Sequence, residues 1–176
     1  GYRLGKEKFN VDLVAYYFKL DQTITTFTNS QGVVLFQNAG ATDQKGIEGA
    51  VDYSFVRNGA GFIQDLSIGT AYTGQFFTFK DYQKGENDFS GNELTGVPET
   101  TLVTRWDLRT KPGIYLNFTH QYVSELPLND ANAVYQDPYN LVNMRLGWAK
   151  SFSGKWEVEA FAGVDNLLNE SYSLGN

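Results

Sequence analysis

Hydrophobic residues recur at every second position in several long segments of this chain. The regular segments are 47–55, 66–76, 102–109, 114–122, 142–149 and 156–165, and a less regular one covers about 9–26. In the first of them, Ile47, Val51 and Phe55 share one face, whereas Glu48 and Asp52 share the other. Because successive side chains of a strand point to opposite faces, this period predicts seven β-strands, each with one apolar and one polar face.

The lengths of the segments and of their connections indicate where such strands would lie. Several segments are candidates for roughly 15 residues or more, whereas strands of globular proteins usually have about 5–6. Tight connections at 5–8, 57–61, 110–113 and 153–155 alternate with longer polar ones at about 28–33, 80–94 and 127–138. Short turns alternating with long loops are typical of transmembrane barrels. We therefore predict an all-β fold, an antiparallel transmembrane β-barrel, although a soluble sandwich remains an alternative.

Composition narrows the classes of function. Aromatic residues make up 15% of the chain and there are 18 glycines, a mixture that favours strands and turns. There is no cysteine and only one histidine, His120, so we expect no cofactor, no metal site and no cysteine nucleophile. The net charge of −6 argues against a nucleic-acid partner. Enzymes are the least supported class of function.

Three stretches of the sequence resemble a known family. They are "FQNAGATDQKGIEGAVDYSF" at 36–55, "LTGVPETTL" at 94–102 and "AGVDNLLNESY" at 162–172. The first is similar to a recurring strand of TonB-dependent outer-membrane receptors, the second to a strand entry, and the third to their penultimate strand. The stretches follow the order of that family, and the resemblance covers nearly the whole chain.

The resemblance has consequences for the architecture. Receptors of this family are barrels of about 22 strands that enclose a plug. Seven strands cannot close such a barrel, so we expect residues 1–176 to be the C-terminal segment of the barrel, with the plug domain and the last strand absent from the chain. The location implied is the outer membrane of a Gram-negative bacterium.

The resemblance also implies a function. We expect a receptor that actively takes up a scarce nutrient, most often a ferric siderophore or another iron complex, although a corrinoid or a glycan remains open. TonB, with ExbB and ExbD, would energise uptake through the missing plug. Other implied partners are outer-membrane lipid, lipopolysaccharide and an accessory outer-membrane lipoprotein. The alternatives are a complete eight-stranded barrel that acts as an adhesin or structural protein, and a soluble β-sandwich that binds carbohydrate.

Two sets of residues are candidates for the functional site. Aromatic side chains in or beside the long loops are candidates for ligand contacts, with stabilisation of the loops as the alternative; they are Tyr82, Phe89, Tyr135 and Tyr139. Charged side chains on the polar faces are expected to face the lumen or the plug and not to act as catalytic groups; they are Glu48, Asp52, Arg105, Asp107, Arg109, Arg145, Glu157, Glu159 and Asp165. His120 is an exception to the pattern, because it falls on an apolar face.

Overall fold

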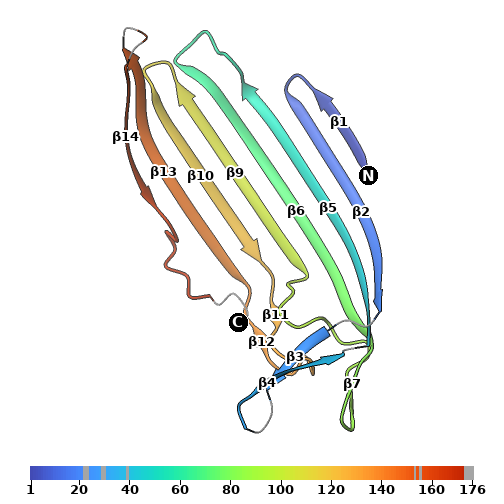
Figure 1. Ribbon diagram of the computed structural model, residues 1–176. Coiled ribbons are helices and arrows are strands. Elements are labelled where there is room, and N and C mark those ends of the chain that lie inside the picture. Colours follow the sequence, from blue (N-terminus) through green and yellow to red (C-terminus); the bar gives the residue numbers. More distant parts are fainter. Residues whose placement is uncertain (22–23, 29–30, 39, 153, 155, 173–176) are drawn as a thin grey trace.

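The main feature of the structure is one large antiparallel sheet. The computed structural model describes residues 1–21, 24–28, 31–38, 40–152, 154 and 156–172. The sheet has eight strands in the order β1-β2-β5-β6-β9-β10-β13-β14 (Figure 1). These strands are β1 (Tyr2–Lys6), β2 (Phe9–Asp21), β5 (Ala41–Val56), β6 (Ile63–Asp81), β9 (Thr100–Thr110), β10 (Ile114–Val123), β13 (Tyr139–Phe152) and β14 (Trp156–Val164). Within the described residues, no helix is long and apolar enough to cross a membrane.

The sheet is open, because β1 and β14 lie at its two edges and each pairs with a single neighbour. The predicted fold class, an incomplete antiparallel barrel, is thus confirmed. The sheet has one strand more than the seven that the sequence predicts. The added strand is β1, which pairs with β2 across the first tight turn. Its five residues are too few to display an alternating pattern that would stand out from a turn.

The connections fall into two classes at opposite ends of the sheet (Figure 1). At the turn end lie the predicted tight turns, although Ser153 and Lys155 of the fourth turn lie outside the described residues. At the loop end, the long connections contain small hairpins, formed by β3 (Ile24–Thr28) with β4 (Val34–Asn38), β7 (Gln83–Lys84) with β8 (Asn87–Asp88), and β11 (Leu126–Pro127) with β12 (Tyr135–Gln136). The predicted strand 9–26 is therefore wrong in its extent, since β2 ends at Asp21 and the chain then enters a separate hairpin.

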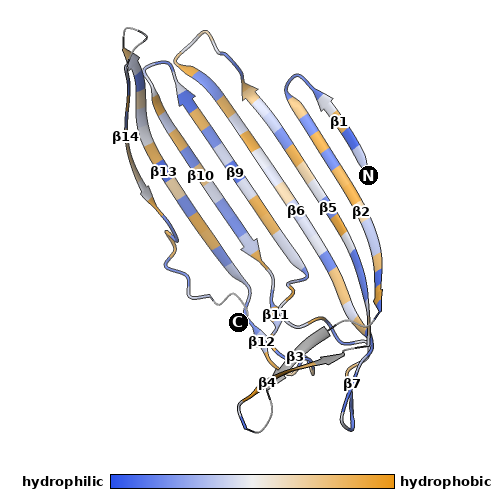
Figure 2. Cartoon of the chain, in the orientation of Figure 1, coloured by the Kyte–Doolittle hydropathy of each residue, from blue (hydrophilic) through white to orange (hydrophobic). Residues whose placement is uncertain are grey.

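The strand register joins the apolar positions into continuous rows across the sheet. One row consists of Tyr53, Ile68, Trp106, Phe118 and Met144. Figure 2 shows the resulting alternation of hydrophobic and hydrophilic residues along each strand. We call this side of the sheet the apolar face, and the opposite side, which contains Asp52 and Arg105, the polar face.

The apolar face is not covered by a second layer in the described part of the chain. Ile47 is 51% exposed, Leu146 52% and Trp156 75%. A soluble sandwich would bury such side chains between two sheets, so the arrangement does not support that alternative. An exposed, continuous apolar surface of this kind matches the lipid-facing side of a membrane barrel.

His120 finds a polar partner on the apolar face. Its Nε2 atom lies 2.9 Å from Oδ1 of Asn140, and both residues are partly buried. Two polar side chains that satisfy one another can remain on an apolar surface at much lower cost than either alone. The exception in the sequence pattern is thus explained by a neighbour on the next strand.

The buried hydrophobic residues lie at the loop end of the sheet and in the loops next to it. Phe79 and Tyr82 are only 4% and 1% exposed, and Phe89 and Leu94 pack against them. Residues 91–99 run beside β6 and continue its hydrogen-bond ladder, for example from Leu94 N to the carbonyl oxygen of Phe77 at 3.0 Å. The connection between β6 and β9 is therefore packed against the sheet.

Candidate functional site

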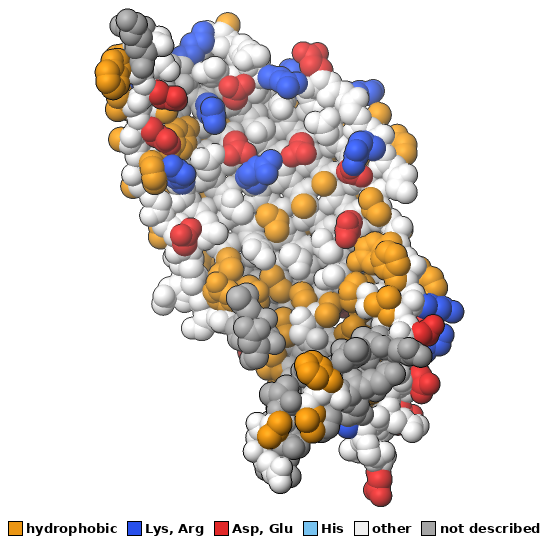
Figure 3. Space-filling model, in the orientation of Figure 1, with side chains coloured by type: hydrophobic (Ala, Val, Ile, Leu, Met, Phe, Trp, Pro, Cys, Tyr) orange, Lys and Arg blue, Asp and Glu red, His pale blue; other side chains and the backbone are white. Residues whose placement is uncertain are grey.

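The polar face is divided into two halves along the strands (Figure 3). Acidic and basic side chains gather over the half near the turns, and hydrophobic side chains gather nearer the loops. We call the first the charged half, defined by Asp52, Arg105, Asp107, Arg145 and Glu159. We call the second the aromatic half, defined by Tyr16, Phe18 and Phe77.

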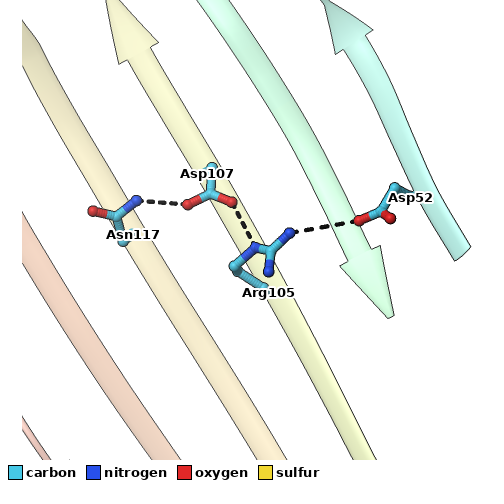
Figure 4. Close-up of polar contacts among 4 residues, drawn as sticks. All are labelled: Asp52, Arg105, Asp107 and Asn117. Carbon is cyan, nitrogen blue, oxygen red and sulfur yellow. Dashed lines mark hydrogen bonds and ion pairs between the residues drawn. The ribbon is translucent and has the colours of Figure 1, made fainter. Parts of the chain in front are cut away.

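Four side chains from three strands form a connected chain in the charged half (Figure 4). The Arg105 Nε atom donates to Asp107 Oδ2 at 2.9 Å, and its Nη2 atom lies 3.5 Å from Asp52 Oδ1. Asn117 donates from Nδ2 to the other oxygen of Asp107 at 2.6 Å. The predicted spacing of Arg105 and Asp107 on one strand face is thus confirmed. The Arg105 guanidinium is thus held between two carboxylates from different strands.

A glycine makes the longer of these contacts possible. In the register, Gly69 of β6 lies between Asp52 on one side and Arg105 on the other. A Cβ atom at Gly69 would lie 2.6 Å from Asp52 Oδ1 and 3.2 Å from Arg105 Nη2. The absence of a side chain therefore lets Arg105 reach across β6 to a strand with which it is not paired.

A second charged group lies further along the sheet. The Arg145 Nη2 atom donates to Glu159 Oε1 at 3.3 Å, and its guanidinium lies 3.6 Å from the centre of the Phe161 ring. The Tyr115 hydroxyl also donates to Glu159. Tyr115, Arg145 and Glu159 border a groove of about 370 Å³ on the polar face, to which Arg109 and Glu157 also contribute.

The charged side chains are mostly open to solvent. The side chains of Asp52 and Arg105 are 53% and 56% exposed, and those of Arg145 and Glu159 are 45% and 46% exposed. Glu48 is also exposed on the polar face, and Asp165 is exposed directly after β14. Ion pairs this exposed contribute roughly 0–1 kcal/mol to stability. They therefore contribute little to holding the sheet together.

The aromatic half was not anticipated from the sequence. The rings of Tyr16 and Phe18 lie 5.3 Å apart, and those of Tyr16 and Phe77 lie 6.4 Å apart. Phe18 is 53% exposed, although it stands on the otherwise polar face. The signal in the sequence is that Tyr16 and Phe18 are an even number of residues from Asp12, which places them on the same face of a strand. The irregular pattern of segment 9–26 conceals this signal.

Two of the predicted ligand contacts, Tyr82 and Phe89, take part in the packing of the loop end. Their ring centres are 5.5 Å apart, and Tyr82 also lies 4.7 Å from the ring of Phe79. Because Tyr82 is 1% exposed, a ligand could touch its side chain only after the loop moves. Phe89 is partly exposed and remains within reach.

Asp130 connects the two loops that flank β9 and β10. Its carboxylate accepts hydrogen bonds from the Tyr82 hydroxyl at 3.1 Å and from the Thr95 hydroxyl at 2.7 Å. Nearby, the Asn132 side chain accepts from Glu93 N at 2.7 Å and donates to Glu93 O at 3.1 Å. These contacts between residues far apart in sequence fix the two loops relative to each other.

The other two predicted contacts differ in their surroundings. Tyr135 is 40% exposed in the loop. Partial desolvation and then the carboxylates of Glu93 and Glu125 raise the pKa of the Tyr135 phenol, so it remains a neutral donor. Tyr139 begins β13 and is 6% exposed, and its ring stacks on Tyr172 with the ring centres 4.9 Å apart. Whether any of the four contacts a ligand stays a prediction.

The family model for the "TonB dependent receptor-like, beta-barrel" domain matches residues 1–167. The chain belongs to this family. Its matched segment covers every strand of the open sheet and every loop described above. The family is one of transport receptors and not of enzymes. The predicted resemblance is therefore confirmed.

Solved structures of TonB-dependent receptors have the same fold. The ferric preacinetobactin receptor BauA from Acinetobacter baumannii superposes with a TM-score of 0.70 at 16% identity, over 96% of this chain and 24% of that one. The ferric yersiniabactin uptake receptor FyuA from Yersinia pestis superposes with a TM-score of 0.68 at 17% identity, over 96% of this chain and 24% of that one. The FrpB iron transporter from Neisseria meningitidis superposes with a TM-score of 0.63 at 13% identity, over 96% of this chain and 26% of that one. The chain thus spans about a quarter of the length of these structures.

Proposed function

We propose that this chain belongs to an outer-membrane receptor of a Gram-negative bacterium that imports a scarce nutrient. In this proposal, the apolar face contacts lipid and the polar face lines the lumen, where its charges meet a plug domain. The support is the family of the chain, the exposed apolar face, and the opposite polar face with its ion pairs. Uptake would be energised by TonB, together with ExbB and ExbD.

The nutrient in this proposal is a ferric siderophore or another iron complex. All three structures with the same fold are described as receptors or transporters of iron. Because the sequence identities are only 13–17%, that similarity supports the fold itself and the cargo only by analogy.

The observation that carries the proposal is the aromatic half. Phe18 is 53% exposed, and Tyr16 and Phe77 are partly exposed beside it. An apolar patch on an otherwise polar surface often marks a binding site. Tyr16, Phe18 and Phe77 form a platform close to the loops, at the end where an external ligand would arrive. Rings of this kind can stack on the flat organic part of an iron chelate.

We further propose that residues 1–176 form the C-terminal segment of a longer barrel. The support is the open sheet together with the quarter share of the solved receptors that the chain covers. The plug, the site of the TonB interaction, would lie in the remainder of the receptor.

The test is uptake of radiolabelled iron by cells that produce the full-length receptor as their sole siderophore receptor. A panel of ferric siderophores first identifies the cargo. Phe77→Ala should then raise the half-saturating concentration by about tenfold, the effect of losing roughly 1.4 kcal/mol of binding energy. Phe18→Ala should act in the same direction.

Phe76→Ala is the matched control. Phe76 neighbours Phe77 on β6, is 43% exposed, and lies on the apolar face. It should leave the half-saturating concentration unchanged at equal amounts of receptor in the membrane. Equal effects of the two variants would count against the aromatic platform, and an absence of transport of every iron complex would count against iron as the cargo.

A further inference from the structure

Lysines gather at the loop end of the apolar face. In the register, Lys45 of β5 pairs with Tyr17 of β2, and Lys19 of β2 pairs with Asp43 of β5. Lys80 of β6 reaches the same place, since its Nζ atom lies 4.0 Å from Asp43 Oδ1. All three lysines are exposed, so three strands contribute one basic cluster.

Tyr17 and Asp43 hold the centre of this cluster. The ammonium groups of Lys19 and Lys45 lie 5.7 Å and 5.8 Å from the centre of the Tyr17 ring. The Tyr17 hydroxyl donates to Asp43 at 3.1 Å. The single central carboxylate is thus shared by a tyrosine and Lys80, whereas the two other ammonium groups rest on the aromatic ring.

Two of the lysines therefore keep binding capacity. In the described part of the chain, neither Lys19 nor Lys45 has a carboxylate within 4.0 Å. Asp21 and Asp81 lie one row further toward the loops, on either side of Ala41. The lysines therefore lie between these two aspartates and the apolar part of the face.

The position of the cluster along the strand is informative. From Phe55 to Ile47, the outward positions of β5 are apolar or glycine, and Lys45 is the first charged residue after them. That apolar stretch covers about nine residues, which is the length a tilted strand needs to cross the hydrocarbon core. Tyr17 and the lysines thus lie where lipid headgroups begin, with an aromatic residue at the boundary.

We propose that Lys19, Lys45 and Lys80 bind the phosphate groups of a lipid headgroup in the outer leaflet. The ring of Tyr17 supports the ammonium groups, and the apolar face below accepts the acyl chains. Charge complementarity favours a phosphorylated lipid as the occupant, because the lysines adjoin a surface that only hydrocarbon can cover. The inference rests on the proposed outer-membrane location.

The test counts lipid molecules bound to the full-length receptor in detergent by native mass spectrometry. The probe is lipopolysaccharide with a short sugar chain, compared with the same lipid after enzymatic removal of its phosphates. Each lysine near an anionic surface strengthens attachment by about fivefold, so Lys19→Gln with Lys45→Gln should weaken binding roughly 25-fold. The dephosphorylated lipid should bind the unaltered receptor with similar weakness.

Lys6→Gln with Lys8→Gln is the matched control, because it removes the same charge at the turn end of the β1–β2 hairpin, where both lysines are exposed. It should change the affinity by less than about twofold. Equal losses of lipid affinity in the two double variants would show that the lysines act only through general charge attraction, and would overturn the proposal. Full displacement by an equal concentration of inorganic phosphate would instead assign the lysines to a free anion.

Iron uptake by the same variants separates this inference from the proposed function. If the Lys19→Gln with Lys45→Gln variant took up iron normally and bound the lipid as tightly as the unaltered receptor, only the lipid site would be overturned. Retained lipid binding in a receptor that transports no iron complex would leave the lipid site supported and contradict the proposed cargo.

Discussion

Single residues on the polar face show how tyrosines compensate for glycines in strands. Tyr16 lies over Gly46 of the paired strand, and Tyr115 lies over Gly147 in the same way. A Cβ atom at Gly46 would come within 2.2 Å of Tyr16 Cζ, and one at Gly147 within 2.3 Å of Tyr115 Cζ. A glycine inside a strand ordinarily weakens it, and a ring that covers the exposed backbone restores packing.

Replacing Gly46 by alanine should therefore destabilise the sheet. The added methyl group would displace Tyr16, at a cost of about 1–3 kcal/mol, as is typical when a packed site is overfilled. Chemical unfolding of the full-length receptor in detergent would measure this loss.

Gly49→Ala on the same strand is the control for that experiment. Its Cβ would meet only the end of the Leu13 side chain, at 3.2 Å, which can rotate away. In a Tyr16→Ala background, Gly46→Ala should cost much less than it does alone. A cost that stays the same without the tyrosine ring would show that the explanation is wrong.

Among the elements, β5 shows how a strand separates two environments. Val51 is 38% exposed on the apolar face, while its neighbour Ala50 lies on the polar face beside Asp12 and Ala71. The physical difference between the faces is the solvent that each is expected to meet, hydrocarbon on one and water or protein on the other.

Arginine substitutions at these two neighbours should have very different effects. Val51→Arg should cost about 2–4 kcal/mol, because it places a charge against the middle of the bilayer. Ala50→Arg should cost far less, because the polar face meets water or protein, although the neighbouring Asp12 carboxylate is already paired with Arg3. The measurement is unfolding of the receptor in lipid vesicles, and similar costs at the two sites would contradict the assignment of the faces.

The loops form a second element whose rigidity depends on Asp130. Asp130→Ala would remove the hydrogen bonds that this carboxylate accepts from the Tyr82 and Thr95 hydroxyls, each of which typically contributes about 1 kcal/mol. We expect faster hydrogen exchange at residues 82–96, with no change in β13.

Asp137→Ala is the comparison for the loop prediction. Asp137 is an exposed acidic residue of the same connection, so its loss should leave exchange in 82–96 unchanged. If Asp130→Ala also left exchange unchanged, the hydrogen bonds of Asp130 would not be what joins the two loops.

At the scale of the whole molecule, the two sides of the open sheet present different surfaces. One side of the eight strands is the apolar face. On the other side, the charged half and the aromatic half follow one another along the strands (Figure 3). Four of the strands are longer than the roughly 9–11 residues that a crossing needs, since β2 has 13 residues, β5 16, β6 19 and β13 14. The excess at the loop end supports the ordered loops and the lysine cluster.

The intact mass of the native polypeptide tests the proposal that this chain is the C-terminal segment of a larger receptor. We expect a mass several times the 19.7 kDa of these residues, in the outer-membrane fraction extracted with detergent. A mass near 19.7 kDa in that fraction would favour a complete small barrel.

Much of this architecture could be predicted from the sequence because its causes are local. Side-chain alternation requires only the geometry of a strand, so the apolar and polar faces of β5, β9, β10, β13 and β14 followed from their residues. The tight turns and long loops could be placed for the same reason. The five-residue strand β1 and the end of β2 at Asp21 could not, because no local pattern marks them.

The tertiary structure alone decided which residues meet across strands. Arg105 reaches Asp52 over Gly69, Tyr82 is buried under a loop, and Lys19 joins Lys45 and Lys80 beside one tyrosine. Each of these contacts depends on strand register or on loop closure between residues distant in the chain. The sequence by itself determined the period of each strand and the family, whereas pairing between strands determined the sites, since a shift of one residue would send every side chain to the opposite face.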